Sequence, residues 1–503
     1  MRSKKAIYNI LTNLLLQLIG IVYGFIVPKI IISNFGSNVN GLISSITQFL
    51  AYITLLESGF GPVVRSLLYK PIANKDKKTI ANILKSSEKF FRIISFIFVA
   101  YIVVLCFIYP TLINTEFEFI FTFSLIIIIS ISTFAEYYFG MTYRLFLQAD
   151  QKSYIISLIQ IITYILSIAL IVVLAKLGCS IHIIKLFSGF VFVLRPIMQN
   201  IYVKKKYNIN LKEAEDNYKI EQKWDGLAQH IAAVIHGNTD ITILTFFTTL
   251  AEVSVYSVYY MVVSGIKRLV QVFSSSLDAG FGDMIAKDET DNLNKKFNVY
   301  EVAYYSLITI IFTCTIILIV PFISIYTKGV NDANYIRYTF GYLIVISEYI
   351  WAIRLPYSSI TLAAGHFKQT RIGAWIEALS NIIVSLILVS KYGIVGVAIG
   401  TIVAMTIRTI EFVYHSNKYI LSRNVFISVK KITLIIIETI LIVIISRYLP
   451  FLDSVNYINW LINALMIFIV SLVITLSINI IFYNKEFKEL FKILKSFVRK
   501  IRK

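Results

Sequence analysis

The sequence has few charged residues for its length. Only 15% of its 503 residues are Asp, Glu, Lys or Arg, against roughly 25% in soluble proteins, while 57% are hydrophobic. A soluble core does not require one apolar run after another. The first run, residues 6–32, carries a single charge, Lys29, and exceeds the roughly 20 residues that span a bilayer. The composition therefore predicts a helical membrane protein with many spans.

Cysteine is also scarce, and nucleotide-binding glycine loops are missing. The cysteines Cys106, Cys179 and Cys314 each lie inside an apolar run, with no disulfide framework and no metal-ligand spacing. We interpret them as small packing residues, and we expect no metal and no cofactor. No GxxxxGK[ST] loop occurs, so transport by this chain is expected to be ion-coupled or downhill.

Acidic residues are outnumbered, 28 against 48 basic, which gives a net charge of +20. Apolar runs predict roughly fourteen spans, and the basic residues outside them fall almost entirely on one side. The opposite side has only Lys176, Lys328, Arg337, Lys391 and Arg447. Short cytoplasmic loops are enriched in Lys and Arg, so both termini are predicted to be cytoplasmic, in a multi-pass membrane protein. The charge then reports topology, and we expect no nucleic-acid partner.

Two pairs of similar segments recur in the same order along the chain. Gly59-Phe60-Gly61 matches Gly280-Phe281-Gly282, and Lys176-Leu177-Gly178 matches Lys391-Tyr392-Gly393. The fold class predicted is an all-α polytopic membrane protein, with two parallel-repeat six-helix bundles plus two C-terminal helices. The predicted divisions are residues 1–205, 206–424, 425–484 for the added helix pair, and 485–503 for a basic amphipathic tail on the membrane lipids.

Basic and polar side chains within the predicted spans are candidates for binding substrate, because ionisable groups at membrane depth usually face a cavity. Adjacent Lys267 and Arg268 need anionic partners, either protein carboxylates or a substrate phosphate. The remaining candidates are Arg65, Arg195, Arg354 and Gln48. For Arg65 the alternative is snorkelling to the headgroups.

Acidic and histidine residues in the spans are candidates for ion coupling. His236 and Asp240 are four residues apart and could exchange a proton near physiological pH. A simple interhelical hydrogen bond is the alternative. Glu57, eight residues before Arg65, is expected near it on one helix. Glu348 and Glu377 are further candidates, and the alternative is that they are counter-ions of the basic residues. Arg408 and Glu411 are predicted to form a local ion pair.

The stretch FGSNVNGLISSITQFLAYITLLESGFGPVVRSLLYKPIANKDKKTI, residues 35–80, resembles the Wzx-type polysaccharide flippases. These form a branch of the multidrug/oligosaccharidyl-lipid/polysaccharide exporter superfamily. The matching positions are Phe35-Gly36, Asn40-Gly41-Leu42, Leu55 to Gly59 and Tyr69-Lys70-Pro71. The resemblance implies movement of undecaprenyl-diphosphate-linked oligosaccharide across the bacterial plasma membrane, for O-antigen of lipopolysaccharide, capsule or a similar polymer. A polysaccharide polymerase and glycosyltransferases would be its partners.

Other functions are weighed against this one. A drug/cation antiporter of the same superfamily would favour an acidic, aromatic cavity, which the basic pair Lys267-Arg268 opposes. A membrane-embedded glycosyltransferase or polymerase should have a large outer loop or clustered acidic residues, and the sequence has neither. We therefore predict a transporter and not an enzyme.

Overall fold

A computed structural model describes residues 2–57, 59–113, 117–207, 209, 214–215, 238–275 and 278–501. In these ranges the regular structure is helical, and the protein is an all-α polytopic membrane protein. Among the described residues, ten helical segments are long and apolar enough to cross a membrane. The spans are predicted to start near residues 6, 41, 90, 117, 154, 180, 225, 251, 299, 337, 370, 393, 428 and 458. A helix includes each of these positions or begins within two residues of it, except at the seventh, Asp225, which lies outside the described residues; residues 238–247 are helical.

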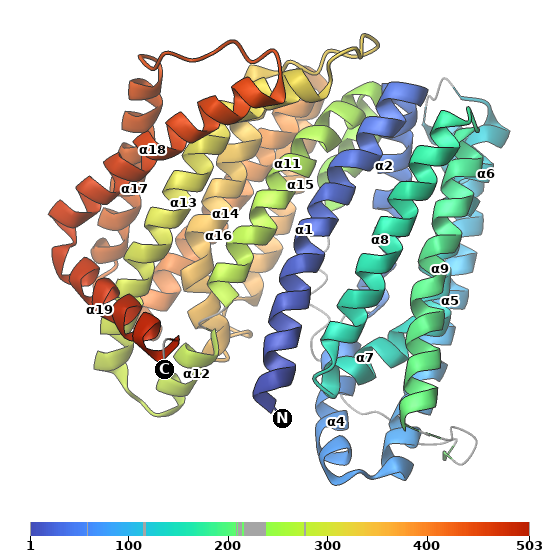
Figure 1. Ribbon diagram of the computed structural model, residues 1–503, viewed down its shortest axis with the longest axis horizontal. Coiled ribbons are helices and arrows are strands. Elements are labelled where there is room, and N and C mark those ends of the chain that lie inside the picture. Colours follow the sequence, from blue (N-terminus) through green and yellow to red (C-terminus); the bar gives the residue numbers. More distant parts are fainter. Residues whose placement is uncertain are drawn as a thin grey trace. The chain divides into compact units, whose positions relative to one another are not determined.

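The chain divides into two compact units, Met1–Ser257 and Val258–Lys503. The helices of the first unit (Figure 1) are α1 (Arg2–Phe35), α2 (Ser37–Ala51), α3 (Thr54–Glu57), α4 (Phe60–Asn74), α5 (Lys77–Leu112), α6 (Phe119–Ala135), the π-helical η1 (Glu136–Gly140), α7 (Met141–Ala149), α8 (Ser153–Lys176), α9 (Ile181–Tyr207), residues 238–247 and the start of α11 (Leu250–Ser275).

The second unit contains the rest of α11 and the helices that follow it (Figure 1). These are α12 (Asp278–Ala286), α13 (Thr290–Tyr326), α14 (Tyr338–Ala363), α15 (Arg371–Tyr392), α16 (Ile394–Tyr419), α17 (Phe426–Ser446), α18 (Tyr457–Phe482) and α19 (Asn484–Ile501). The tail helix α19 packs against α13 and α18 and buries Phe487. The predicted divisions after residues 205, 424 and 484 stay predictions.

The second predicted span is not one continuous helix. It breaks after α3, and Gly59 takes a left-handed conformation with φ 87° before α4 begins. Glycine adopts this conformation without the steric cost that a Cβ imposes. Glu57 and Arg65 therefore lie on different helices, and the expectation that they share one helical face is wrong.

The two Gly-Phe-Gly segments occupy similar local structures in their own units. Each lies near the start of a short helix, α4 or α12, that precedes a helix of about 54 Å, α5 or α13. In the first unit Phe60 is buried and stacks on Phe90, with ring centroids 3.8 Å apart. In the second, buried Phe281 contacts the ring of Phe297 at 5.8 Å. The repeated sequence thus marks repeated local packing.

The second pair of matching segments also has matching conformations. Gly178 follows α8 with φ 71°, and Gly393 follows α15 with φ 54°. Each positive φ lets the chain reverse within a few residues into the next helix, α9 or α16. The hairpins α8–α9 and α15–α16 are therefore equivalent by position and by their turn glycines.

Candidate functional site

Lys267 of α11 is held by two residues of α14. Its Nζ lies 2.8 Å from a carboxylate oxygen of Glu348 and 4.5 Å from the centre of the Trp351 ring. Glu348 and Trp351 are three residues apart and so share one face of α14. The Lys267 side chain is 23% exposed, whereas that of Glu348 is 5% exposed. The pair therefore combines a buried carboxylate with a cation that is still partly accessible.

A second set of charges continues along the same bundle. Arg354 of α14 contacts Glu377 of α15 at 2.6 Å, and Glu377 also lies 3.4 Å from Arg408 of α16. Arg408 donates to the Thr370 carbonyl at 2.8 Å and pairs with Glu411, as the sequence predicted. Basic and acidic side chains alternate along these contacts, which link α14, α15 and α16.

A glycine makes the last of these contacts possible. The Glu411 carboxylate lies against α15, where a Cβ placed on Gly373 would come within 1.6 Å of one of its oxygens. Any side chain at position 373 would occupy the space of that carboxylate. Glycine therefore allows Glu411 to lie between α15 and α16 beside Arg408.

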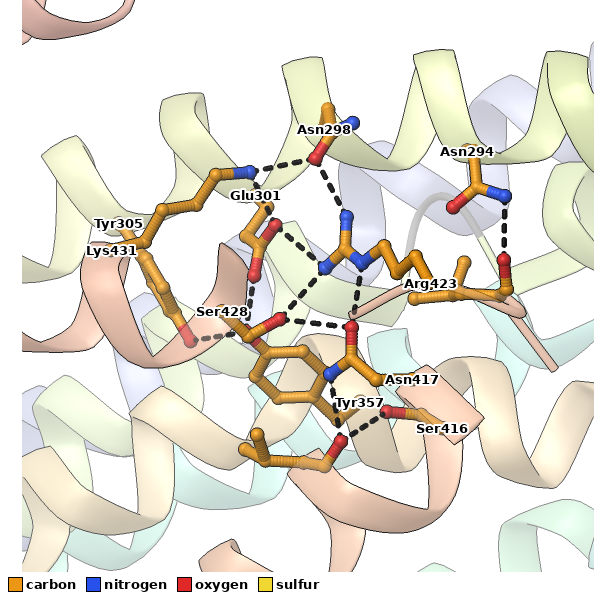
Figure 2. A network of polar contacts seen from close by, with 12 residues as sticks. Asn294, Asn298, Glu301, Tyr305, Tyr357, Ser416, Asn417, Arg423, Ser428 and Lys431 are labelled. Atoms are coloured by element: carbon orange, nitrogen blue, oxygen red, sulfur yellow. Dashed lines mark hydrogen bonds and ion pairs between the residues drawn. The ribbon is translucent and has the colours of Figure 1, made fainter. Parts of the chain in front are cut away.

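A separate charged cluster surrounds Glu301 of α13 (Figure 2). Its carboxylate lies 2.5 Å from Lys431 Nζ of α17 and 3.1 Å from Arg423 in the loop before α17. Tyr357 of α14 donates to the same carboxylate, and Asn298 accepts from both cations. The Glu301 side chain is 0% exposed. The cluster joins the start of α17 to α13 and α14, with two cations on one carboxylate.

Sequence reasoning missed the cluster around Glu301. Glu301 and Lys431 each lie a few residues inside a predicted span, where charges commonly mark the membrane interface, and Arg423 lies in a loop. No spacing in the sequence connects the three positions. Only the packing of α13 against α17 brings them together.

In the first unit the predicted candidates do not form one site. Glu57 accepts a hydrogen bond from Tyr137 at 2.9 Å, while Arg65 donates to Gln148 at 3.0 Å. Arg195 of α9 donates to Thr163 of α8 at 2.7 Å. Its guanidinium also lies over the rings of Tyr164 and Phe192, at 4.6 and 4.2 Å.

Gln48, another candidate of the first unit, belongs to a seam of uncharged contacts between α2 and residues 238–254. Gln48 of α2 donates to Asn238, and Thr245 donates to Ser45 at 2.8 Å. Asn40 donates to Ser254 at 2.8 Å. Amides and hydroxyls thus join α2 to residues 238–254.

Three further candidates are placed differently from one another. Asp240 accepts from Tyr256 at 2.8 Å. His236 lies outside the described residues, so its pairing with Asp240 stays a prediction. Arg268 is exposed and, in the ranges that the structure describes, forms no ion pair. Of the adjacent basic residues, only Lys267 joins the charged contacts of α14.

Comparison with known proteins gives a match at the level of the fold. No family model matches the sequence, and no curated protein matches it. A solved structure of the lipid II flippase MurJ in an inward closed conformation superposes with a TM-score of 0.70 and 19% identity, covering 95% of this chain and 99% of that one. The chain has the same fold as that flippase.

Two transporters described as members of the MOP superfamily have the same fold, with lower TM-scores. An inward-facing multidrug resistance MATE transporter of the MOP superfamily gives a TM-score of 0.64 at 13% identity, covering 79% of this chain and 94% of that one. A MOP superfamily transporter from Pyrococcus furiosus, described as having a binding pocket of reverse polarity, gives 0.54 at 13% identity, with 82% and 92% covered. At 13–19% identity, these structural similarities establish the fold alone.

Proposed function

We propose that the protein is a flippase that moves undecaprenyl-diphosphate-linked oligosaccharide across the bacterial plasma membrane by alternating access. Both termini would be cytoplasmic, and the product would serve assembly of a surface polysaccharide by a polymerase and glycosyltransferases. The observation that carries the proposal is the partly exposed Lys267 held by Glu348 and Trp351. The fold shared with the lipid II flippase supports it.

The substrate would bind by replacing the Glu348 carboxylate at Lys267. In the ion pair the Glu348 carboxylate occupies the position that a phosphate oxygen would take, because both are anionic acceptors for the same ammonium group. A diphosphate would displace the Glu348 carboxylate from the ammonium group of Lys267.

Arg354 and Glu377 offer a second exchange of the same kind. Glu348 and Arg354 are six residues apart on α14, a rise of about 9 Å. The Arg354 side chain is 12% exposed, less than that of Lys267. Lys267 is therefore assigned the first contact with diphosphate, and Arg354 a later one.

The experiment uses purified protein in vesicles that contain undecaprenyl-diphosphate-linked oligosaccharide. Accessibility of the glycan to a membrane-impermeant oxidant measures flipping. Lys267→Gln should lower the rate about tenfold or more, because a hydrogen bond to a charged group contributes roughly 1.5–3 kcal/mol. Lys391→Gln is the matched control in the same unit, since exposed Lys391 lies at the end of α15.

The same vesicles separate the flippase from a drug/cation antiporter. Proton-driven uptake of an organic cation by the wild type, with no movement of the glycolipid, would establish the antiporter and overturn the flippase. Equal flipping by wild type and Lys267→Gln, with both folded, would remove Lys267 from the substrate site.

A further inference from the structure

The outer surfaces of α8 and α9 enclose an apolar groove of about 520 Å³. On α8 its wall includes Ile155, Ile159 and Ile162, and on α9 it includes Met198 and Ile201. The spacing of three to four residues places each set along one face of its helix. The groove belongs to the first unit and is separate from the charged contacts around Lys267.

The two ends of the groove differ in polarity. Lys205 and Lys206 line the end near the C-terminus of α9, whereas the lining elsewhere is apolar except for Tyr202. From Lys206 to Met198 the helix rises about 12 Å, close to the roughly 15 Å thickness of one leaflet of the hydrocarbon core. A cationic end followed by an apolar wall of this length matches a single membrane lipid, with the headgroup at the cationic end and an acyl chain along the wall.

Within the described part of the chain, no protein anion pairs with the two lysines at the groove. The nearby carboxylate of Asp150 lies 2.9 Å from Lys152 and 3.3 Å from Lys5, and it also accepts a hydrogen bond from Tyr207. Lys205 and Lys206 are exposed and form no ion pair within the described part of the chain. The charge at this end therefore favours an anionic headgroup over a zwitterionic one.

We propose that the α8–α9 groove binds one anionic phospholipid of the inner leaflet, with an acyl chain along Ile155–Ile162 and Met198–Ile201 and its phosphate on Lys205 and Lys206. The site does not depend on the identity of the transported substrate. Bound lipid would fill the space between α8 and α9 near the membrane surface, where the Lys-rich end is predicted to be cytoplasmic.

Native mass spectrometry of the purified full chain tests the site, with equimolar phosphatidylglycerol and phosphatidylcholine in detergent. One phosphatidylglycerol should be retained in preference to phosphatidylcholine. Lys205→Gln and Lys206→Gln should each weaken its retention about fivefold, the effect of one basic residue near an anionic lipid. The matched control is Lys204→Gln, because Lys204 is the adjacent exposed lysine that does not line the groove.

A second pair of variants tests the apolar wall. Ile201→Trp should fill the groove and reduce retention of either lipid, whereas Ile197→Trp should not, because Ile197 is an exposed residue of α9 outside the groove. Equal retention of the two lipids, or an equal effect of Lys204→Gln, would overturn the proposal. Displacement of phosphatidylglycerol by equimolar undecaprenyl phosphate would reassign the groove to a polyprenyl chain and would likewise overturn it.

Discussion

The two units differ in how they use charge within their helices. In the second unit the Glu301 cluster and the Glu377 contacts are buried, with the Arg408 side chain 9% exposed. In the first unit the ion pair Arg92–Glu88 lies at the surface, with 48% and 23% of the two side chains exposed. The Lys152–Asp150 pair, with 14% and 13% exposed, lies between α7 and α8 and not within a helix. The interior contacts of the first unit at α2 are instead made by amides and hydroxyls, such as Asn40 and Thr245.

Uncharged hydrogen bonds and buried ion pairs differ in their energetic cost, and the amino-acid composition does not show which of the two a region contains. Neutral hydrogen bonds satisfy polar groups without the desolvation cost of a charge. A buried ion pair costs several kcal/mol per ion to desolvate, and good geometry only offsets that cost. Charges kept in such positions are therefore expected where they hold a particular arrangement or exchange partners. Under the proposed function, the groups that respond to an anionic substrate would therefore lie in the second unit.

The largest expected effect is removal of charge at Glu301. Glu301→Gln leaves Arg423 and Lys431 buried without their carboxylate, which should lower the free energy of unfolding by about 3–5 kcal/mol. The matched substitution Glu88→Gln should cost less than about 1 kcal/mol, because the Arg92–Glu88 pair is exposed. Chemical unfolding in detergent micelles measures both. Equal losses would contradict the contrast between the two units.

A smaller effect is expected from Gly373→Ala. The added Cβ displaces the Glu411 carboxylate from Arg408 and so removes a hydrogen bond between charged groups, at a cost of about 1–3 kcal/mol. Gly282→Ala in α12 is the control, because outside the neighbouring residues and backbone of its own helix no atom lies within 4 Å of the position of its Cβ. That control should be neutral or stabilising by roughly 0.5–1 kcal/mol. Thermal unfolding measures the stability of both variants. If Gly373→Ala is not less stable than Gly282→Ala, the close approach of Glu411 to Gly373 does not contribute to stability.

A single uncharged hydrogen bond of the first unit should contribute less to the free energy of unfolding. Thr245→Val removes the hydroxyl that donates to Ser45, with an expected loss of about 1 kcal/mol in unfolding free energy. It should leave flipping unchanged, because the seam carries no charge. A large loss of transport with normal stability would show that the seam contacts substrate.

The smallest expected effect is a pH dependence at Asp150, between α7 and α8. Burial alone would raise the pKa of this carboxyl, but hydrogen bonds from Tyr207 and Lys152 and the charges of Lys152 and Lys5 lower its pKa below the usual range. Its contribution to stability is therefore present at neutral pH and disappears as the pH falls below about 4, through the lowered pKa.

Unfolding of wild type and Asp150→Asn between pH 7 and pH 3 measures that contribution. The difference in stability between them should shrink toward the acid end. The same substitution at exposed Asp453 is the control. A difference that stays constant with pH would show that the Asp150 carboxylate has no stabilising ionised state.

Much of the fold follows from the sequence. Apolar runs locate the helices, and the glycines at 178 and 393 mark two equivalent hairpin turns because both end a helix with a positive φ. The break at Gly59 was not predictable, since the apolar pattern continues across it. Of the candidate site, Lys267 was identified by its depth in a span, and Arg408–Glu411 by helical spacing.

The partners of the charged candidates required the packing of separate helices. Glu348 and Glu377 were considered both as coupling groups and as possible counter-ions of the basic candidates, but the sequence did not indicate that Glu348 would contact Lys267 and Glu377 would contact Arg354. Periodicity describes one helix at a time and does not indicate which face meets which neighbour. For the same reason the separation of Glu57 from Arg65 became visible only in the structure.

The most direct test of the account is the charge exchange Lys267→Glu with Glu348→Lys, assayed for flipping in vesicles. The exchange restores an ion pair between α11 and α14, so the double variant should unfold near the wild-type temperature while each single variant is less stable. If Lys267 binds an anionic substrate, flipping stays lost in the folded double variant, because the cation now projects from α14. Recovery of wild-type flipping would show that the pair is only structural and would contradict the account.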